Sequence, residues 1–351
     1  MINNESIDPN LILNLTIDEY LDSIGNVLII DILYMYVNTT VTILGTLLSG
    51  ICIWIFFNKE FDQSFYLYYK ILSINSFIHE FLGFWYSICY SPRFVPFKYQ
   101  HACVDYGNTF VAIHFFCFFY SGLIEVGILL DRIKIFTQRF KIIDRLDPKK
   151  MLIISFSFSL LIGILSLFIY KTTGLIWYNY EYDYINSTLI LKQKSIYFFD
   201  SSDFAKSEIG EVYVDVLSFI LNVPLLVIIV ILNIILVYLM RKHYRESLTK
   251  FTIQPTQREK KEKAKRKISF MAIYLCSISI ISRTIVLTDL IVFKLGTDYI
   301  SLILIAFSDL FIFINSGCLF FVCFSFNKIF KGKLLGILKI QTNQEISRNI
   351  F

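Results

Sequence analysis

The stretch "LNVPLLVIIVILNIILVYLM", Leu221–Met240, contains no Asp, Glu, Lys or Arg. About 20 apolar residues are enough for a helix to cross a bilayer, so this stretch predicts a membrane span. Similar runs lie at about 32–57, 65–90, 106–130, 151–172, 213–240, 268–293 and 299–325. The 351 residues are 56% hydrophobic, with a mean hydropathy of +0.61. We therefore expect an all-α integral membrane protein, a bundle of seven transmembrane helices.

Lys and Arg are distributed unevenly along the chain. The first 31 residues contain neither, segments 134–150 and 241–267 are rich in both, and segment 328–333 contains three lysines. Because basic residues favour the cytoplasmic side of a membrane, these three segments are predicted to be cytoplasmic. With seven spans, the N-terminus is then extracellular. The expected protein is a multi-pass protein of the plasma membrane.

This topology divides the chain into an extracellular tail (1–31), the bundle (32–325), and an amphipathic helix with a short cytoplasmic tail (326–351). Glycosylation sequons begin at Asn4, Asn14 and Asn186, all in segments predicted to be outside. No basic residue precedes the first apolar run, which therefore does not look like a cleaved secretory signal. We expect the first span to direct its own insertion.

A charged pair ends the third apolar run, in "GILLDRIKIF", Gly127–Phe136. With seven spans around it, this segment resembles the rhodopsin-like (class A) G-protein-coupled receptors. Asp131 and Arg132 match the first two positions of that family's acidic-Arg-aromatic triplet, and Ile133 replaces the usual Tyr. Pro224 matches the fifth-helix proline, and "FNKIFKGKLL" is similar to the family's amphipathic helix on the inner membrane face.

The resemblance implies a receptor that couples an extracellular ligand to a heterotrimeric G protein. An intramembrane enzyme is disfavoured because the sequence has no HExxH motif and no Gly-Asp pair of an aspartyl site, and we expect no cofactor or nucleic-acid partner. Asp131 would hold Arg132 closed at rest, and outward movement of the sixth helix would free Arg132 for the G protein. The alternative is an Arg that reaches the membrane surface from a helix end, with Asp131 as an incidental neighbour.

Other family positions differ. Asn75 or Ser76 stands near the second-helix Asp that serves the family's sodium site. The sixth span lacks the family's Trp and Pro, and Leu319 and Cys323 replace the Asn and Tyr of the seventh. The sequence therefore indicates a divergent member of the family or a neighbour of it.

The family's usual disulfide cannot form, because the second outer loop, from Thr172 to Val212, contains no cysteine. Cys103 lies near the top of the third helix, and Cys89 is the other cysteine expected outside. We predict a Cys89–Cys103 bridge, with two unpaired thiols as the alternative. The other five cysteines are expected to be apolar packing residues, and none of the seven forms a zinc motif.

Polar residues within spans are costly to bury, so they are candidates for the ligand pocket. His114 lies five turns from Arg132, at the depth that faces the ligand in the family, or else it is a core histidine bonded between helices. An amine ligand is disfavoured because the family's amine receptors have Asp at that position. Further candidates are Glu80, Tyr86, Arg283 and Asp309, together with His79 and Asp289. Arg283 and Asp309 could instead pair with each other.

The loop after the fourth span alternates apolar and polar residues in "STLILKQKSIYFF", which predicts a short hairpin over the pocket. This Tyr-rich loop favours a peptide or a chemosensory molecule as the ligand. The competing function is a transporter or channel with a polar path through His79, Glu80, Arg283 and Asp309. It would favour broken helices, but Pro224 is the only proline within a predicted span.

Overall fold

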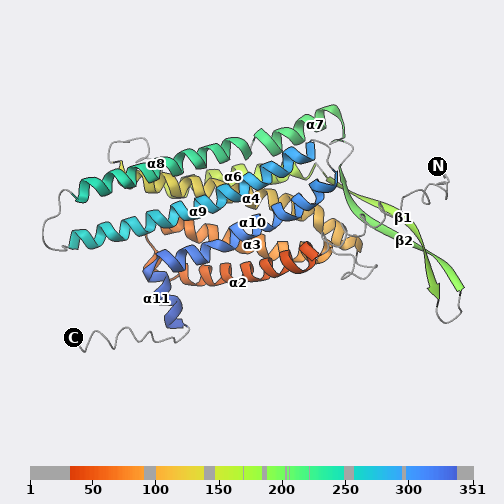
Figure 1. The fold of residues 1–351 in the computed structure, drawn as a ribbon, viewed down its shortest axis with the longest axis horizontal. Coiled ribbons are helices and arrows are strands. Elements are labelled where there is room, and N and C mark those ends of the chain that lie inside the picture. Colours follow the sequence, from red (N-terminus) through yellow and green to blue (C-terminus); the bar gives the residue numbers. More distant parts are fainter. Residues whose placement is uncertain are drawn as a thin grey trace.

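The protein forms a bundle of long, roughly parallel and antiparallel helices in a computed structural model (Figure 1). The structure describes residues 32–90, 100–137, 147–168, 170–183, 188–201, 204, 206–220, 222–248, 257–294 and 298–337. The helices of the bundle are α2 (Thr39–Phe56), α3 (Tyr66–Tyr90), α4 (Gln100–Phe136), α6 (Pro148–Ser166), α8 (Asn222–Leu248), α9 (Gln257–Lys294) and α10 (Asp298–Phe326). This arrangement confirms the predicted seven-helix bundle.

Shorter elements extend or connect these helices. A π-helical segment, η2 (Leu33–Asn38), precedes α2, and the 3-10 helix η3 (Lys59–Phe61) lies between α2 and α3. The fifth helix is composite: α7 (Glu208–Asp215) and η5 (Val216–Ile220) lead into α8. The final helix, α11 (Lys328–Ile337), turns away from the bundle at one end (Figure 1).

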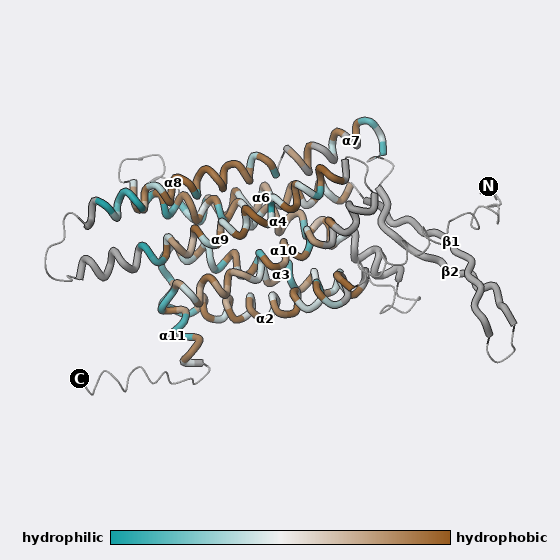
Figure 2. The backbone as a smooth tube through the Cα atoms, in the orientation of Figure 1, coloured by the Kyte–Doolittle hydropathy of each residue, from teal (hydrophilic) through white to brown (hydrophobic). Residues whose placement is uncertain are grey.

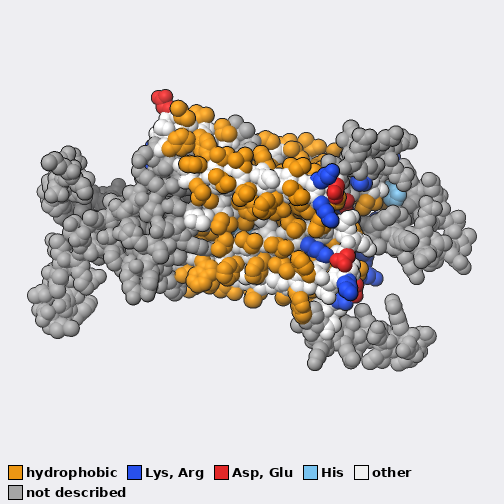
Figure 3. All heavy atoms as spheres, turned by 180° about the vertical axis from the view of Figure 1, so that it is seen from behind, with side chains coloured by type: hydrophobic (Ala, Val, Ile, Leu, Met, Phe, Trp, Pro, Cys, Tyr) orange, Lys and Arg blue, Asp and Glu red, His pale blue; other side chains and the backbone are white. Residues whose placement is uncertain are grey.

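Hydrophobic residues predominate along the middle of the bundle (Figure 2). On the face drawn in Figure 3, apolar side chains cover this middle part and charged side chains gather beyond it, at the end near α11. Six of the described helices are long and apolar enough to cross a membrane. α3 is not among them, but its polar residues Asn75, His79 and Glu80 are all buried. These polar groups lower its hydropathy while facing other helices rather than lipid, so α3 completes the bundle.

α4 is the central helix. It contacts α3, α6, α8 and α9. In its most apolar 18-residue stretch 61% of the residues are buried, against 28% in the corresponding stretch of α8. The helix continues to Phe136, beyond the predicted end at residue 130. Asp131 and Arg132 therefore lie within the last turns of a helix, where their side chains face other helices.

Local capping explains where two helices begin. Asp147 accepts a hydrogen bond from the backbone N–H of Lys149 (3.1 Å), and Pro148 follows in the first turn of α6. Asn327 ends α10 and begins α11, because its side-chain oxygen accepts from the N–H groups of Ile329 (3.1 Å) and Phe330 (3.2 Å). The buried ring of Phe330 then packs on Phe56 of α2.

The predicted hairpin is present, but it is longer than expected. β1 (Tyr170–Asp183) pairs antiparallel with β2 (Thr188–Ser201) along its whole length, from Tyr170 opposite Ser201 to Asp183 opposite Thr188. The fourth span consequently ends at Ser166 instead of residue 172, since its predicted last residues belong to β1. The hairpin projects away from the bundle at the end opposite α11 (Figure 1). We call the two ends the hairpin end and the α11 end.

Candidate functional site

At the α11 end, Arg132 is buried inside the bundle. Its side chain is 3% exposed, and its guanidinium forms an ion pair with the carboxylate of Asp131, which is 21% exposed. The guanidinium carbon lies 4.6 Å from the centre of the Phe65 ring. The Nε of Arg132 makes no hydrogen bond to any described residue. The predicted contact between Asp131 and Arg132 is thus present, and an aromatic ring completes it.

Phe65 belongs to a group of rings at the start of α3. Its centroid is 3.9 Å from that of Tyr66, whose hydroxyl accepts a hydrogen bond from the side-chain amide of Asn327 (3.1 Å). Tyr69 is also buried, one turn along the helix. The surroundings of Arg132 thus reach the junction between α10 and α11.

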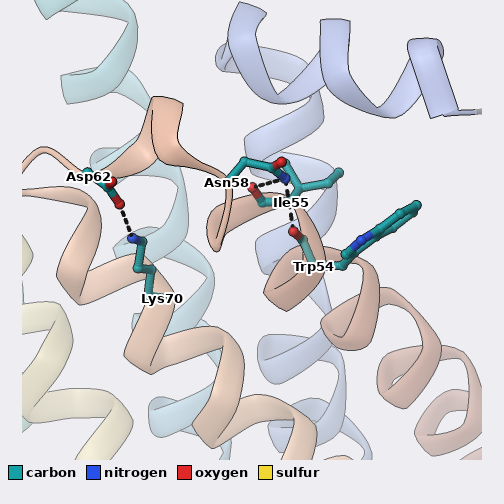
Figure 4. Close-up of polar contacts among 5 residues, drawn as sticks. All are labelled: Trp54, Ile55, Asn58, Asp62 and Lys70. Atoms are coloured by element: carbon teal, nitrogen blue, oxygen red, sulfur yellow. Dashed lines mark hydrogen bonds and ion pairs between the residues drawn. The ribbon is translucent and has the colours of Figure 1, made fainter.

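The connection between α2 and α3 is held by polar contacts (Figure 4). Asn58 donates from its side-chain amide to the carbonyls of Trp54 (3.1 Å) and Ile55 (3.0 Å), which closes the end of α2. Lys70 donates to Asp62 (3.1 Å), which ties the connection to the first turns of α3. Phe65 is therefore placed by a connection with a defined geometry.

Towards the hairpin end, two histidines from different helices meet. The Nε2 of His79 on α3 lies 3.0 Å from the Nδ1 of His114 on α4, and the Nδ1 of His79 lies 3.2 Å from the Oγ of Ser316 on α10. In the contact between the histidines one nitrogen donates and the other accepts, and the Ser316 hydroxyl donates to Nδ1 of His79 or accepts from it, according to the tautomers. His114 is thus bonded between helices, as the second of its two predicted roles requires.

Aromatic rings surround this histidine pair. The ring of Tyr86 stacks on Phe110 (4.3 Å, 17°), Phe110 contacts His114 (5.6 Å), and His114 lies almost parallel to Phe118 (6.4 Å, 11°). On the other side, His79 contacts Phe313 of α10 (5.3 Å). We call Tyr86, Phe110, His114 and Phe118 the aromatic ladder. It brings two predicted pocket residues, Tyr86 and His114, into one structure.

Arg283 of α9 contacts Phe118, the last residue of the aromatic ladder. Its guanidinium lies 4.1 Å from the Phe118 ring and donates to the Phe118 carbonyl (2.8 Å) and more weakly to Ser121 (3.5 Å). Its Nε also donates to Ser279 (3.3 Å). Gly122 leaves room for the guanidinium, since a Cβ at that position would overlap it. Arg283 thus ties α9 to α4, and its burial is explained without the predicted alternative pairing with Asp309.

A small polar cavity lies between Arg283 and the α11 end. It is lined by Leu72, Ser76, Ser121, Glu125, Leu275, Asn315, Ser316 and Leu319. Its carboxylate comes from Glu125 of α4, which forms hydrogen bonds with the side chains of Ser279 and Asn315. The family's sodium site has its acid on the second helix, where Ser76 and Asn75 stand here. In this chain the carboxylate at this depth is therefore on α4 instead of α3.

Glu80 lies apart from the ladder although it follows His79 directly. It is 0% exposed, and neither carboxylate oxygen makes a hydrogen bond to a described residue. A Cβ on Gly45 of α2 would come within 2.5 Å of its carboxyl carbon, and Gly317 of α10 is also close. Glu80 therefore occupies a glycine-lined contact among α2, α3 and α10. Asp309 is half-buried on α10 and takes part in contacts of its own.

Some predicted sites fall outside what the structure describes. These are the sequons at Asn4, Asn14 and Asn186 and the side chains of Cys89 and Cys103, so glycosylation and the disulfide stay predictions. The remaining cysteines are free and buried, which confirms their packing role: Cys52, Cys117, Cys276, Cys318 and Cys323. Within the described residues, no cluster of three or more His, Cys, Asp or Glu side chains could hold a metal ion.

Several residues of the site were not predicted from the sequence. Phe110 and Phe118 lie four residues before and after the predicted His114, which places all three on one face of a helix and could have indicated the ladder. Phe65 and Gly122 gave no comparable signal, because their roles depend on which arginine each one meets. The roles of Phe65 and Gly122 are therefore visible only from the contacts between helices.

No family model matches the sequence, and no curated protein is similar to it. Its fold is similar to that in the crystal structure of squid rhodopsin, with a TM-score of 0.60. The similarity covers 88% of this chain and 86% of that one, at 14% sequence identity. The chain thus has the seven-helix fold of the rhodopsin-like receptors and is a multi-pass membrane protein.

Proposed function

We propose that the protein is a G-protein-coupled receptor of the plasma membrane, with its N-terminus and hairpin end outside the cell. Its α11 end would face the cytoplasm and bind a heterotrimeric G protein. The observation that carries the proposal is the buried Asp131–Arg132 ion pair near the end of the central helix of a rhodopsin-like fold. The basic segments near the same end support the orientation.

The ligand would bind towards the hairpin end and act on the aromatic ladder. Tyr86 and His114 are its candidate contacts, and the ladder leads from them to Arg283 on α9. The sequence favours a peptide or a chemosensory molecule. A ligand that shifts His114 would disturb the contacts between α4 and α9, the helix expected to move outward during activation.

Nucleotide exchange on purified G proteins, with full-length receptor in lipid nanodiscs, tests the proposal. The expected result is exchange above the rate of empty nanodiscs, in the absence of ligand or after addition from a peptide library. Arg132→Ala should abolish that exchange while the protein stays folded. Arg241→Ala is the matched control, because Arg241 is an exposed arginine on α8. Exchange that is unaffected by Arg132→Ala would contradict the assignment of the switch.

A further inference from the structure

Arg132 is held by more than its neighbouring carboxylate. The guanidinium is in contact with Asp131 on one side and the Phe65 ring on another, and the side chain is 3% exposed. A cation over an aromatic face is attracted more strongly when water is excluded. The ring that meets Arg132 therefore contributes to keeping it in place.

We infer that Phe65, the residue immediately before α3, is a positioning residue that holds Arg132 closed from the connection between α2 and α3. The inference rests on the proposed function for its signalling consequence, but not for the contact itself. The ion pair alone does not fix Arg132 relative to the other helices, because Asp131 is the adjacent residue on the same helix. Removing the ring would thus leave Arg132 free to leave its buried position.

The Phe65 ring is itself held in place. It packs on Tyr66, which contacts Phe61 of η3 edge-on (4.8 Å) and receives a hydrogen bond from Asn327. Asn327 also caps α11, so a displacement of Tyr66 would disturb the start of that helix. A second link joins the same connection to α11, since Lys333 forms an ion pair with Glu60 (2.7 Å).

These contacts suggest how release would occur. Phe65 and the adjoining Tyr66 are anchored to α3, η3 and the junction of α10 and α11, whereas Arg132 is on α4. A shift between α3 and α4 would therefore separate the ring from the guanidinium. His79 and His114 join the same two helices nearer the hairpin end, so a ligand acting there could cause such a shift.

We call the contact between Phe65 and Arg132 the clamp. Four variants test it through the rate of basal nucleotide exchange per folded receptor. Phe65→Ala and Phe65→Leu should raise the basal rate up to about tenfold, since both remove the π face and leucine largely keeps the volume. Phe65→Tyr retains the ring and should stay at the wild-type rate. Phe57→Ala is the matched control, because Phe57 lies on the same connection but is 59% exposed and meets Lys70 instead. A wild-type rate for Phe65→Leu would overturn the inference.

A double-mutant cycle separates this inference from the proposed function. Unfolding of wild type, Phe65→Ala, Arg132→Ala and the double variant is followed in detergent, with no G protein present. We expect the two substitutions to be coupled by about tenfold in the unfolding equilibrium constant. Additive effects would overturn the clamp even if the protein signals. If the two substitutions are coupled but the protein activates no G protein, the contact between Phe65 and Arg132 is supported and the proposed receptor function is contradicted.

Discussion

Arg132 and Arg283 are both almost completely buried, and each lies over a phenylalanine ring, yet their surroundings differ. Arg283 donates to a backbone carbonyl of another helix, to Ser121 there and to Ser279 on its own helix. Arg132 pairs with the residue next to it on its own helix and lies over Phe65. One guanidinium nitrogen of each arginine, Nε of Arg132 and Nη1 of Arg283, makes no hydrogen bond to a described residue. Arg283 joins two helices firmly, whereas Arg132 is held by contacts that a helix movement can break.

This difference separates stability from switching. A buried charge that loses its partners costs several kcal/mol, so a structural arginine cannot move without unfolding its surroundings. Arg132 lies near the end of α4, which ends at Phe136, and Asp131 beside it is 21% exposed, so water can replace its contacts. Charged side chains gather at this end of the bundle (Figure 3). Substitutions at the two positions should therefore affect different measurements.

The largest effect on stability is expected for Arg283→Ala. It removes the hydrogen bonds to Phe118 and Ser121 of α4 and leaves their buried acceptors without this donor, which should cost about 3 kcal/mol of unfolding free energy. Chemical unfolding in detergent measures the loss. Arg241→Ala, on the exposed surface of α8, should change stability by less than about 0.5 kcal/mol. Equal effects of the two substitutions would contradict the structural role of Arg283.

Reducing the space around the Arg283 guanidinium should have the next largest effect on the free energy of unfolding. Gly122→Ala places a methyl group against the guanidinium of Arg283 and against Leu225, which should cost about 1–3 kcal/mol. Gly332→Ala is the control, because nothing lies within 4 Å of a Cβ added at that glycine of α11. In an Arg283→Ala background, the cost of Gly122→Ala should fall. An unchanged cost there would mean that Leu225 alone limits the space.

The sequence was sufficient for the fold and for one end of the site. Seven apolar runs predicted the helices, and the adjacent Asp131 and Arg132 needed no tertiary information to be paired. The sequence could not reveal how each helix is rotated about its axis, because apolar residues face both the lipid and the neighbouring helices. His79 and Glu80 illustrate this limit: they are consecutive, but one meets His114 and the other meets Gly45. For the same reason, the role of Arg283 was not predictable.

The histidine contact towards the hairpin end should couple α3 to α4 by a smaller amount. A double-mutant cycle with His79→Ala and His114→Ala is expected to give a coupling of about 1 kcal/mol, the net value of one buried hydrogen bond. His243 contacts Phe136 at the α11 end, so His243→Ala should be additive with His114→Ala. A coupling free energy near zero for His79 and His114 would contradict the proposed link between α3 and α4.

The smallest effect is expected for the exposed ion pair between Lys333 and Glu60. Both side chains are well exposed, at 38% and 50%, so solvent screens their attraction. Lys333→Ala should lower the unfolding free energy by about 0.5 kcal/mol or less, and the loss should shrink at high salt. A larger, salt-independent loss would show that Lys333 stabilises α11 through packing instead.

The most direct test of the account compares the two buried arginines in one assay, G-protein nucleotide exchange per folded receptor in nanodiscs. Arg132→Ala should yield a normal amount of folded protein that promotes no exchange. Arg283→Ala should yield less folded protein, and the folded fraction should retain exchange. If Arg132→Ala instead promotes exchange at the wild-type rate per folded molecule, Arg132 is not the switch and the account is contradicted.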